Sequence, residues 1–359
     1  MNQKLPLVSV IVVNFNGLRF LEACFDSLDK TTYPNRELLL VDNGSRDESV
    51  SFMESHHPDV RIIRSATNLG FSGGNNLGLS QARGKYVVLL NNDTTVEPGW
   101  LEPLVNEMES DPQVAACQPK LLNLRKPTEF EYAGAAGGFI DRYGYPFLRG
   151  RIFDTIEDDR GQYNNPVDLF WTTGAAMAAR RDVVAELGGL DEDFVLHMEE
   201  IDLCWRMHLQ GKRLRFCPDS VVYHYGGGTL GSEDLAKMYY NHRNNIFMML
   251  KNYAAGNLFK VLPVRFFWDL VLVLKSLVTL DLKRAAAVLG AYGWLMVHPR
   301  LILGKRRTIQ RNRQVDDRQI TPLIYPGSVV AAYYLRRKKR FPDLWPGAYR
   351  ESSSHNQQG

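Results

Sequence analysis

The chain has 359 residues, 45% of them hydrophobic and 23% charged, which is enough for a sizeable core and longer than most single domains. We expect one large domain with an appendage. The 43 Lys and Arg residues against 40 Asp and Glu residues give a formal net charge of +3, which excludes a chain that binds nucleic acid along its whole length. Positive charge gathers in the last third, at 304–313 and 333–341, and such clusters are typical of contacts with phosphates or anionic lipid.

The cysteines and the N-terminus predict a cytoplasmic protein. The cysteines show no C-x-x-C pair and each lies in an apolar or periodic context, which favours a reduced compartment and a packing role over disulfides or zinc. The N-terminus enters a predicted strand directly and lacks the long apolar stretch of a signal peptide. The four residues are Cys24, Cys117, Cys204 and Cys217.

Short β-branched runs alternate with helical patterns in the first third of the chain. We expect strands at 7–15, 37–43, 60–65 and 86–93, and helices at 18–30, 73–83 and 99–109, with a polar helix after the second strand. Short, continuously apolar strands separated by helices are typical of a parallel sheet that is covered on both faces. The sequence therefore predicts a doubly wound α/β fold.

Polar residues stand at or just beyond the ends of these strands. Ligands bind such sheets in the crevice at the carboxyl ends of the strands. The run Asn-Asn-Asp at 91–93, directly after a buried strand, therefore lies where a ligand is expected. The four positions that define this edge are Asn14, Asp42, Asn68 and Asp93.

The middle of the chain is less regular. Residues 121–166 are rich in Gly, Pro and Tyr and lack periodicity, so we expect a long functional loop with little regular structure. Beyond it we expect strands at 167–173, 214–218 and 220–225, and helices at 180–187 and 199–210.

The segment 258–280 is strongly apolar but carries four charges. They fall within about half of a helical circumference, and four charges make a membrane-spanning helix unfavourable. Two interpretations stay open: an amphipathic helix on a membrane surface, which the basic clusters favour, and a helix packed on the rest of the protein. The charges are Lys260, Arg265, Asp269 and Lys275.

Several acidic residues have ordinary structural explanations. Asp93 could cap the helix that follows it, and Asp42 begins an Asx-Gly-Ser turn. Glu199, Glu200 and Asp202 stand in a first helical turn, where acids are common dipole partners, and Asp202 is also spaced i,i+4 from an arginine. A lone histidine such as the one at 224 is more often structural, but beside a carboxylate it becomes a candidate metal ligand.

Several motifs in order resemble those of glycosyltransferase family 2. They are VSVIVVNFNG, LLLVDNGSRDES, NLGFSGGNNLGL, LLNNDT and HMEEIDLCWR, and the likeness covers roughly the first two-thirds of the chain. Members of this family have the GT-A fold and transfer a sugar from a nucleoside-diphosphate donor with inversion. On this basis we expect a GT-A catalytic domain at 1–250, a helical, partly amphipathic and basic region at 251–345, and a polar disordered tail at 346–359.

The resemblance implies a divalent cation, Mn²⁺ or Mg²⁺. LLNNDT matches the family's D-x-D element but has Asn91 at its first position, a departure that the rhamnosyltransferase-like and galactofuranosyltransferase-like branches tolerate. Asp93 must then supply the main anionic contact, and His224 corresponds to a histidine that completes the metal shell in some members. The acidic pair of HMEEIDLCWR includes the catalytic base, which the resemblance assigns to Glu200, with Glu199 beside it.

By the same resemblance, the amides and the acid of the first half bind the nucleotide-sugar donor, for which dTDP-rhamnose is our first expectation and UDP-sugars are the next. The glycines of NLGFSGGNNLGL permit a close approach of the backbone, and its last two asparagines are expected to open a helix. The expected donor-binding residues are Asn14, Asn16, Asp42, Asn43, Asn68, Asn75, Asn76, Asn91 and Asn92.

The acceptor side is expected around FWTTGAAMAARR and the start of the helix at 199–210. Trp171 offers a stacking face and Gly174 leaves room for a sugar, although a tryptophan in a core strand is the commoner case. The apolar and basic last third suits a glycan or polyprenyl-pyrophosphate-linked acceptor at the inner leaflet of the membrane, in cell-surface polysaccharide synthesis. The expected acceptor residues are Trp171, Thr173, Gly174, Asp202 and Trp205.

Three other functions compete with this one. A sugar-phosphate nucleotidyltransferase needs a Gly-rich loop with Arg and Lys after the first strand, where this chain has NFNGLRF. A processive polysaccharide synthase needs several spans of about 20 apolar residues and a Q-x-x-R-W segment, where this chain has YYNHRNNIF. A non-catalytic nucleotide-sugar binding protein could keep Asp42 and Asp93 but would not need Glu200.

Overall fold

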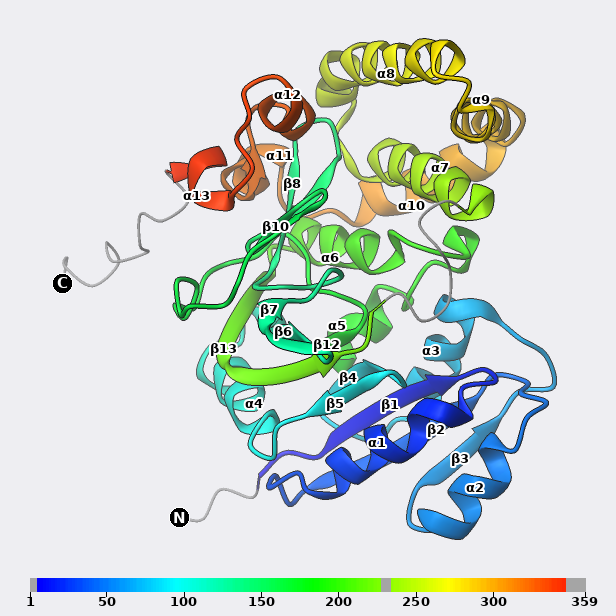
Figure 1. Cartoon of the computed structure of the whole chain (residues 1–359), viewed down its shortest axis with the longest axis vertical. Coiled ribbons are helices and arrows are strands. Elements are labelled where there is room, and N and C mark those ends of the chain that lie inside the picture. The colour runs from blue at the N-terminus through cyan, green and yellow to red at the C-terminus, as the bar shows by residue number, and fades with distance from the viewer. Residues whose placement is uncertain (1–4, 227–233, 347–359) are drawn as a thin grey trace.

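A mixed sheet forms the centre of the molecule (Figure 1). In this computed structural model, which describes residues 5–226 and 234–346, its strands are β1 Val8–Asn14, β2 Arg36–Asp42, β3 Arg61–Arg64, β4 Tyr86–Asn91, β5 Thr94–Val96, β6 Val114–Asn123, β7 Lys126–Phe130, β12 Ala176–Arg180 and β13 Arg213–His224. Their order is β3-β2-β1-β4-β12-β6-β13-β5, and β7 pairs with β6 outside this path. The predicted GT-A arrangement, an α/β sheet with a helical C-terminal extension, is confirmed.

The first half of the sheet is parallel, as the sequence predicts. Strand β1 pairs in parallel with both β2 and β4, and β2 pairs in parallel with β3. Strands β1 and β4 are buried along nearly their whole length, because helices cover both faces of the sheet. The carboxyl ends of these strands therefore meet at one edge.

The second half of the sheet is partly antiparallel. Strand β12 lies antiparallel between β4 and β6, and β5 runs antiparallel to β13. The register of the last pair sets His224 opposite Thr94. The end of β13 therefore lies beside the segment through which the chain leaves β4.

Helices cover both faces of the sheet. Two hydrophobic clusters result, one beneath α1, α2 and α4 and one beneath α3, α5 and α6. Helix α3 starts at Gly70, so the expectation that Asn75 and Asn76 open a helix is wrong: both lie in its middle. The helices are α1 Leu18–Asp29, α2 Ser49–His56, α3 Gly70–Gln81, α4 Leu101–Ser110, α5 Arg181–Glu186 and α6 Glu199–Leu209, with the 3₁₀ helix η1 at Glu192–Phe194.

The segment 121–166, expected to be a long loop, instead forms most of a small second sheet. Its strands are β8 Gly138–Asp141, β9 Pro146–Leu148, β10 Arg151–Ile152, β11 Thr155–Ile156 and the C-terminal β14 Ile324–Tyr325, in the order β11-β10-β9-β8-β14. The strand expected at 167–173 is also wrong, since only isolated bridges form there and β12 follows. The two strands expected at 214–218 and 220–225 are one long strand, β13.

The C-terminal third is helical and packs on the rest of the protein. Its elements are α7 Leu235–Asn252, α8 Ala255–Val278, α9 Leu282–Val297, α10 Pro299–Asn312, α11 Asp317–Ile320, η2 Thr321–Leu323, α12 Val329–Tyr334 and α13 Phe341–Leu344. Apolar side chains from α8, α10, α12 and α13 belong to the same hydrophobic cluster as α6 and the large sheet. The expected domain boundary at 250 falls inside α7, and nearly all of the expected disordered tail lies outside the described residues.

Helix α8 turns its buried charge pair towards the protein and leaves a row of apolar side chains on its outer side. Arg265 and Asp269 are each only 1% exposed and face the protein, whereas Lys260 and Lys275 are exposed. Among the described residues no single helix is long and apolar enough to cross a membrane; the pair α9 and α10, bent by 75°, passes that test by length and composition only.

Candidate active site

Asp93 and His224 are in contact at the carboxyl edge of the large sheet. Nε2 of His224 lies 3.0 Å from Oδ1 of Asp93, and Nδ2 of Asn91 lies 3.4 Å from the same nitrogen. Both Asp93 and His224 have nearly buried side chains, 11% and 7% exposed. The structure therefore brings together the two side chains that the sequence singles out as metal ligands.

Glu131 belongs to the same cluster, although no sequence pattern indicates it. Its Oε1 lies 3.2 Å from Nδ1 of His224, on the other side of the imidazole ring, and its Oε2 accepts a hydrogen bond from the backbone of Ala133. Burial alone would lower the pKa of His224, but the two carboxylates outweigh it and raise the pKa to about 10. The pKa of Asp93 is lowered, because the hydrogen bond and charge of His224 outweigh burial.

The chemistry of this cluster fits a divalent cation. A buried imidazole nitrogen beside a carboxylate oxygen is a donor pair that Mn²⁺ accepts, and Mg²⁺ accepts the oxygen. Two carboxylates flank one histidine, so the cluster has a surplus of negative charge when the ring is neutral. Glu131 touches the nitrogen that faces away from Asp93, which is the arrangement that orients metal-binding histidines in proteins.

The amides at the ends of β1 and β4 bind one another. Nδ2 of Asn92 donates to Oδ1 of Asn14 at 2.7 Å, and Nδ2 of Asn14 donates to Oγ of Ser45 at 3.3 Å. Ser45 also accepts from the backbone of Asn16, and its own backbone nitrogen donates to Asp42. These expected donor-binding residues thus lie together, and their mutual hydrogen bonds hold three loops at the sheet edge.

The amides after β2 and in α3 have mainly structural partners. Asn43 donates to the side chain of Asn68 at 3.0 Å and accepts from the backbone of Leu69 at 2.9 Å. Nδ2 of Asn75 donates to Phe71 within its own helix. The side chain of Asn76 bonds to Leu190 and Glu192, which ties α3 to η1, so its amide is already occupied.

Glu199 and Glu200 open α6 beside a cavity. Glu200 lines this cavity, while Glu199 is buried, and Oε2 of each accepts no hydrogen bond from the described residues. Burial raises the pKa of Glu200 to about 7. Burial and the charge of Glu200 raise the pKa of Glu199 well above its usual range. A carboxylate in this setting can take up a proton near neutral pH.

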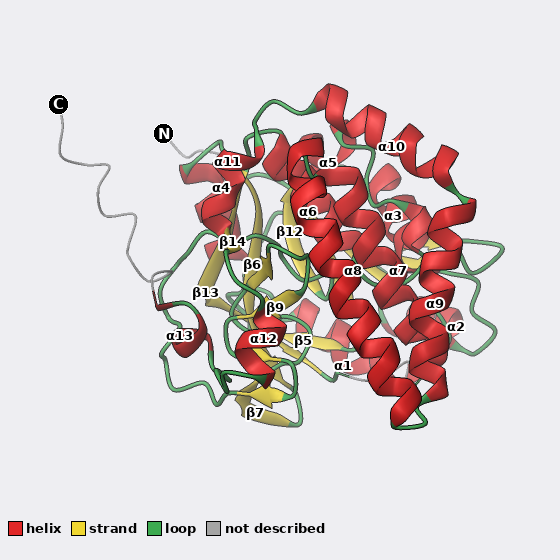
Figure 2. Ribbon diagram, turned by 90° about the horizontal axis from the view of Figure 1, so that it is seen from above, coloured by secondary structure: helices red, strands yellow, loops and turns green. Residues whose placement is uncertain are grey.

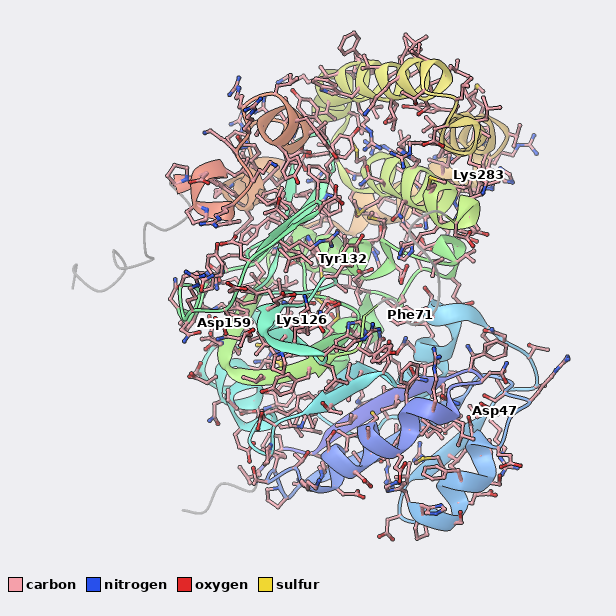
Figure 3. All side chains as sticks on the ribbon, viewed as in Figure 1. Asp47, Phe71, Lys126, Tyr132, Asp159 and Lys283 are labelled. Carbon is pink, nitrogen blue, oxygen red and sulfur yellow. The ribbon has the colours of Figure 1, made fainter. Side chains whose placement is uncertain are left out.

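The cavity has a volume of about 380 Å³, and its wall mixes aromatic rings with polar and charged side chains. The small sheet, α6, α7 and α8 all contribute to its wall. Trp171 lines it and is held by a hydrogen bond from Nε1 to the backbone oxygen of Phe139 at 2.9 Å. Tyr132, which also lines the cavity, is labelled in Figure 3. Ring faces of this kind stack on sugars or apolar groups.

The other expected acceptor residues fall into two groups. A Cβ on Gly174 would lie 3.0 Å from the ring of Phe71 and 3.7 Å from Cβ of Glu200, so Gly174 does border the acidic pair. Thr173 is buried, and its backbone nitrogen and hydroxyl bond to Gln118 and Ala175.

Asp202 and Trp205 do not reach the cavity. Asp202 is fully buried and lies 2.8 Å from Arg206 and 3.1 Å from Lys251. It forms ion pairs with both residues inside the protein. Trp205 is 1% exposed and packs edge-on against Phe170 and Tyr253. The expectation that these two residues contact the acceptor is therefore corrected: both are core residues.

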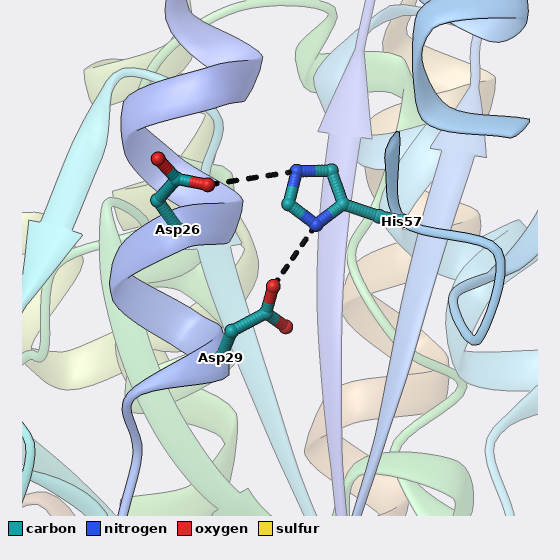
Figure 4. Close-up of side chains that lie close together, drawn as sticks. All are labelled: Asp26, Asp29 and His57. Atoms are coloured by element: carbon teal, nitrogen blue, oxygen red, sulfur yellow. Dashed lines mark hydrogen bonds and ion pairs between the residues drawn. The ribbon is translucent and has the colours of Figure 1, made fainter. Parts of the chain in front are cut away.

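A second cluster with metal-type ligands lies at the opposite edge of the sheet. His57 lies 3.0 Å from Asp29 and 3.9 Å from Asp26 (Figure 4). The two aspartates are in the second half of α1 and His57 follows α2, so the cluster is near the amino ends of the strands. Both ring nitrogens of the buried histidine face an aspartate of α1, so contacts between α1 and the end of α2 account for the cluster.

Comparison with known proteins agrees with this geometry. Residues 9–188, half of the chain, match the sequence model described as glycosyl transferase family 2. The chain belongs to this family. Because members of this family are glycosyltransferases, the predicted enzyme class is confirmed. The matched residues include the edge formed by β1, β2 and β4, whereas Glu200 and His224 lie beyond them.

Curated relatives match between about 60% and 70% of this chain. It is 32% identical over 225 residues to the O-antigen biosynthesis protein RfbC of Myxococcus xanthus, covering 61% of this chain and 17% of that one. It is 23% identical over 267 residues to the N-acetylglucosaminyl-diphospho-decaprenol L-rhamnosyltransferase of Mycobacterium tuberculosis, covering 69% of this chain and 86% of that one. The chain thus spans less than a fifth of the first relative's length.

A solved structure shares the fold. The crystal structure of GalNAc-T7 with UDP, GalNAc and Mn²⁺ aligns with a TM-score of 0.55 and 19% identity, over 71% of this chain and 49% of that one. At this identity the likeness concerns the fold alone.

Proposed function

We propose that this protein transfers a sugar from a nucleoside-diphosphate donor to a hydroxyl group of an acceptor, with inversion at the anomeric carbon and with Glu200 as the base. One observation carries the proposal. A carboxyl group with a pKa of about 7, whose Oε2 accepts no hydrogen bond from the described residues, lines a cavity of about 380 Å³. A base of this kind matches the chemistry of deprotonating an attacking hydroxyl at neutral pH.

Asp93 and His224 would hold the cation, Mn²⁺ or Mg²⁺, and Glu131 would orient His224. The bound ion supplies positive charge to the diphosphate leaving group. Asp42, Asn16 and the hydrogen-bonded pair Asn14 and Asn92 would bind the donor, because they border the same edge of the sheet. The amides of Asn75 and Asn76 are left out of this role, because they bond to Phe71 and Leu190 and not to residues of this edge.

Glu200 would accept the proton of the acceptor hydroxyl as that oxygen attacks the anomeric carbon. The base and the leaving group then lie on opposite sides of this carbon, and a single displacement inverts its configuration. Buried Glu199 lies beside the base, and burial together with the charge of Glu200 raises the pKa of Glu199 well above its usual range, so that Glu200 is the more acidic of the two. Trp171 borders the space for the acceptor, and Gly174 lies between Phe71 and Glu200.

The finer assignments are also proposals. We expect dTDP-rhamnose as the donor, then a UDP-sugar, and a glycan or a polyprenyl-pyrophosphate-linked sugar as the acceptor, in cell-surface polysaccharide synthesis. The name of the mycobacterial relative, a rhamnosyltransferase acting on a decaprenol-linked sugar, supports this choice. A lipid-linked acceptor would require peripheral attachment to the inner leaflet. Residues 1–250 would carry the chemistry, and residues 251–345 would close the cavity through Arg265.

Glu200→Gln tests the proposal most directly, because glutamine keeps the shape of the side chain and cannot accept the proton. We expect transfer to fall by a factor of about 10² to 10⁴ while donor binding is retained. Donor binding is read from the melting temperature with dTDP, UDP, GDP or ADP, each with Mn²⁺ or EDTA, in wild type, Glu200→Gln and Asp93→Ala. A ligand at a hundredfold excess over its Kd stabilises the native state by about 2.7 kcal/mol.

Glu186→Gln, an exposed position on α5, is the matched control and should transfer normally. Unchanged transfer in Glu200→Gln would remove Glu200 from the mechanism. A metal-dependent shift with one diphosphate, lost in Asp93→Ala, would identify the donor base. A melting-temperature shift with a diphosphate in the wild type, without any detectable sugar transfer, would favour the non-catalytic binding protein.

A further inference from the structure

The outward face of α8 is apolar. Figure 2 looks onto this helix, which lies on the outside of the molecule beside α9. Phe259 is 82% exposed and Val278 is 84% exposed, and the exposed side chains between them recur every three or four residues along one stripe. This stripe contains Phe266, Phe267, Leu270 and Leu274.

The inward face of α8 is polar and fixed. Nε of Arg265 donates to Asp269 at 3.0 Å, and the hydroxyl of Tyr292 on α9 donates to the same carboxylate at 2.8 Å. Arg265 also donates to the backbone oxygen of Tyr143, in the turn between β8 and β9, at 3.1 Å. Turning the phenylalanines inward would separate Arg265 from the Tyr143 oxygen and Asp269 from the Tyr292 hydroxyl, and so break these buried hydrogen bonds. The apolar stripe is therefore a fixed outer surface.

The turn after α8 extends this surface. Leu280 has a positive φ of 58°, a conformation that costs a branched residue energy, and its side chain is nevertheless 81% exposed. Leu282, at the start of α9, is 61% exposed. A leucine held outward in this way does not serve the packing of the protein.

The charges around the stripe are positive. Between Ala255 and Asn312 the sequence has ten Lys and Arg residues and two Asp residues. Asp269 is buried, and Asp281 caps α9 and lies 3.1 Å from Arg284, so each is paired within the protein. Lys260, Lys275 and Lys283 are exposed beside the stripe, and Lys283 is marked in Figure 3. Two copies of this chain would bring like charges together here.

We propose that the apolar stripe of α8 and the turn at Leu280 insert into the surface of a bilayer that contains anionic lipids. An apolar face with a lysine border is the combination that such a surface binds. The proposal deepens the proposed function and rests on it for its purpose, since a lipid-linked acceptor would be met at this surface. Binding itself requires no transfer activity, so the two can fail separately.

The test is flotation of the full chain with vesicles of phosphatidylglycerol and phosphatidylcholine, compared with phosphatidylcholine alone. The variants are Phe266→Glu with Phe267→Glu, and Lys260→Glu with Lys275→Glu. Ile156→Glu, at an exposed apolar position of β11, and Lys30→Glu, at an exposed position after α1, are the matched controls. Donor-dependent thermal shift and sedimentation velocity are measured on every variant.

We expect binding only to the anionic vesicles. The phenylalanine variant should bind at least about tenfold more weakly, and the lysine variant roughly fivefold more weakly for each lysine at low salt. The controls should bind as wild type, and the donor-dependent shift should persist throughout. Absence of vesicle binding by wild type, or unchanged binding by the phenylalanine variant, would overturn the proposal. If the wild type is a dimer in sedimentation velocity and the phenylalanine variant is a monomer, the stripe is instead the contact with a second copy of the chain, and the proposal is overturned.

A separate observation concerns the turn that precedes Glu199. Leu196 donates its backbone nitrogen to the oxygen of Phe194 at 2.7 Å, which closes a γ-turn around Val195, with φ 64° and ψ −52°. This turn is rare and strained, and a β-branched residue makes it more so. His197 and Met198 also have positive φ values, 66° and 73°. Three unfavourable conformations thus stand directly before the acidic pair.

Two side chains of α7 hold this turn. Nδ2 of Asn244 donates to the backbone oxygens of Phe194, Leu196 and His197 at 2.7, 2.7 and 2.8 Å. Arg243 donates to the oxygen of Phe194 at 2.9 Å and to Oδ1 of Asn244 at 2.7 Å. Asn244 is fully buried and Arg243 is 5% exposed. Strain that surrounding contacts maintain in this way is typical of functional sites.

We infer that Asn244 is a positioning residue for Glu200, because it holds the strained turn from which α6 presents that side chain. The inference rests on the proposed role of Glu200. Asn244→Ala should lower kcat by about tenfold or more at a temperature well below its Tm, without changing the donor-dependent thermal shift. Val195→Gly, which relieves the strain, should restore part of the kcat when combined with Asn244→Ala.

Asn257→Ala is the control, because Asn257 also bonds through its side chain, to Asp317 at 2.6 Å, away from the cavity. It should lower Tm and leave kcat unchanged. Wild-type kcat in Asn244→Ala, or no gain from adding Val195→Gly, would refute the positioning role. A fully active Glu200→Gln enzyme would instead refute the proposed base, and with it the reason for the turn.

Discussion

Nε2 of His224 lies 3.0 Å from Oδ1 of Asp93, although the two residues are 131 positions apart in the sequence. The contact arises because β5 folds back antiparallel onto β13, so that His224 pairs with Thr94 in the next register position. The candidate metal site therefore depends on the closing strand of the sheet as much as on the tip of β4.

Glu131→Gln should weaken the binding of Mn²⁺ by a factor of about 10 to 100, because the carboxylate that faces Nδ1 of His224 is lost. The measurement is calorimetric titration of Mn²⁺ in the presence of the donor diphosphate. Glu129→Gln is the control, since Glu129 lies on β7, just before Glu131, and pairs with Lys126. Equal Mn²⁺ affinities in the wild type and Glu131→Gln would mean that Glu131 does not support the site.

The rate of transfer should depend on pH through Glu200. A base acts in its deprotonated form, and burial raises the pKa of Glu200 to about 7. The logarithm of kcat/KM should therefore rise with a slope of one up to about pH 7 and then level off. The residual activity of Glu200→Gln should lack this rise. A profile that is flat between pH 5 and 8 in wild type would argue against Glu200 as the base.

Asp191 should contribute stability that disappears in acid. Burial raises its pKa, but the ammonium groups of Lys251 and Lys305 outweigh burial and lower the pKa to about 2. Because the folded pKa lies below the unfolded value of about 4, the contribution is present above pH 4 and is lost as the pH falls towards 2. Its size is about 2 kcal/mol.

Asp191→Asn should accordingly lower the free energy of unfolding by about 2 kcal/mol at pH 7 and by much less at pH 2.5. Urea unfolding at the two pH values measures the difference. Asp59→Asn, at an exposed position, should change neither value. A loss of equal size at both pH values would show that the ion pair is not the source.

Gly17→Ala should loosen the donor edge of the sheet. A Cβ at this position would lie 2.3 Å from both Oδ1 of Asn14 and Nδ2 of Asn92, which are joined by a hydrogen bond of 2.7 Å. We expect about 1–3 kcal/mol of destabilisation and a donor-diphosphate Kd that rises about tenfold. Gly99→Ala, where a Cβ has room, is the control. An unchanged Kd would remove this amide pair from the donor site.

The parallel half of the sheet could be predicted because its strands are unusual in sequence. The runs VSVIVVN and YVVLLN are apolar on both faces, and only a strand covered by helices on both sides buries them fully. The small sheet could not be predicted, since its strands have two to four residues and too few positions to show alternation. These short segments become strands because they pair with neighbouring segments in the fold, and their own sequences give no sign of it.

The same reasoning explains the outcome at the site. Asp93 follows a recognisable strand and Glu200 lies at the start of a recognisable helix, so the position of each could be predicted from the residues around it. Glu131 follows an edge strand with mainly exposed residues, and only the fold brings it against His224. Helix α8 has two faces in its sequence, but periodicity does not say which one turns inward; the pairing of Arg265 with Asp269 decides that.

Helix α8 contributes one side chain to the cavity wall and carries the apolar stripe on its outer side. Arg265, on its inner side, lines the same cavity as Glu200, and the phenylalanines on its outer side point away from the protein. A helix is only about 10–12 Å across. With this helix lying on lipid, an acceptor head group would travel about one helix diameter to reach the base, and its supply would be set by the density of lipid per unit area rather than by a concentration in solution.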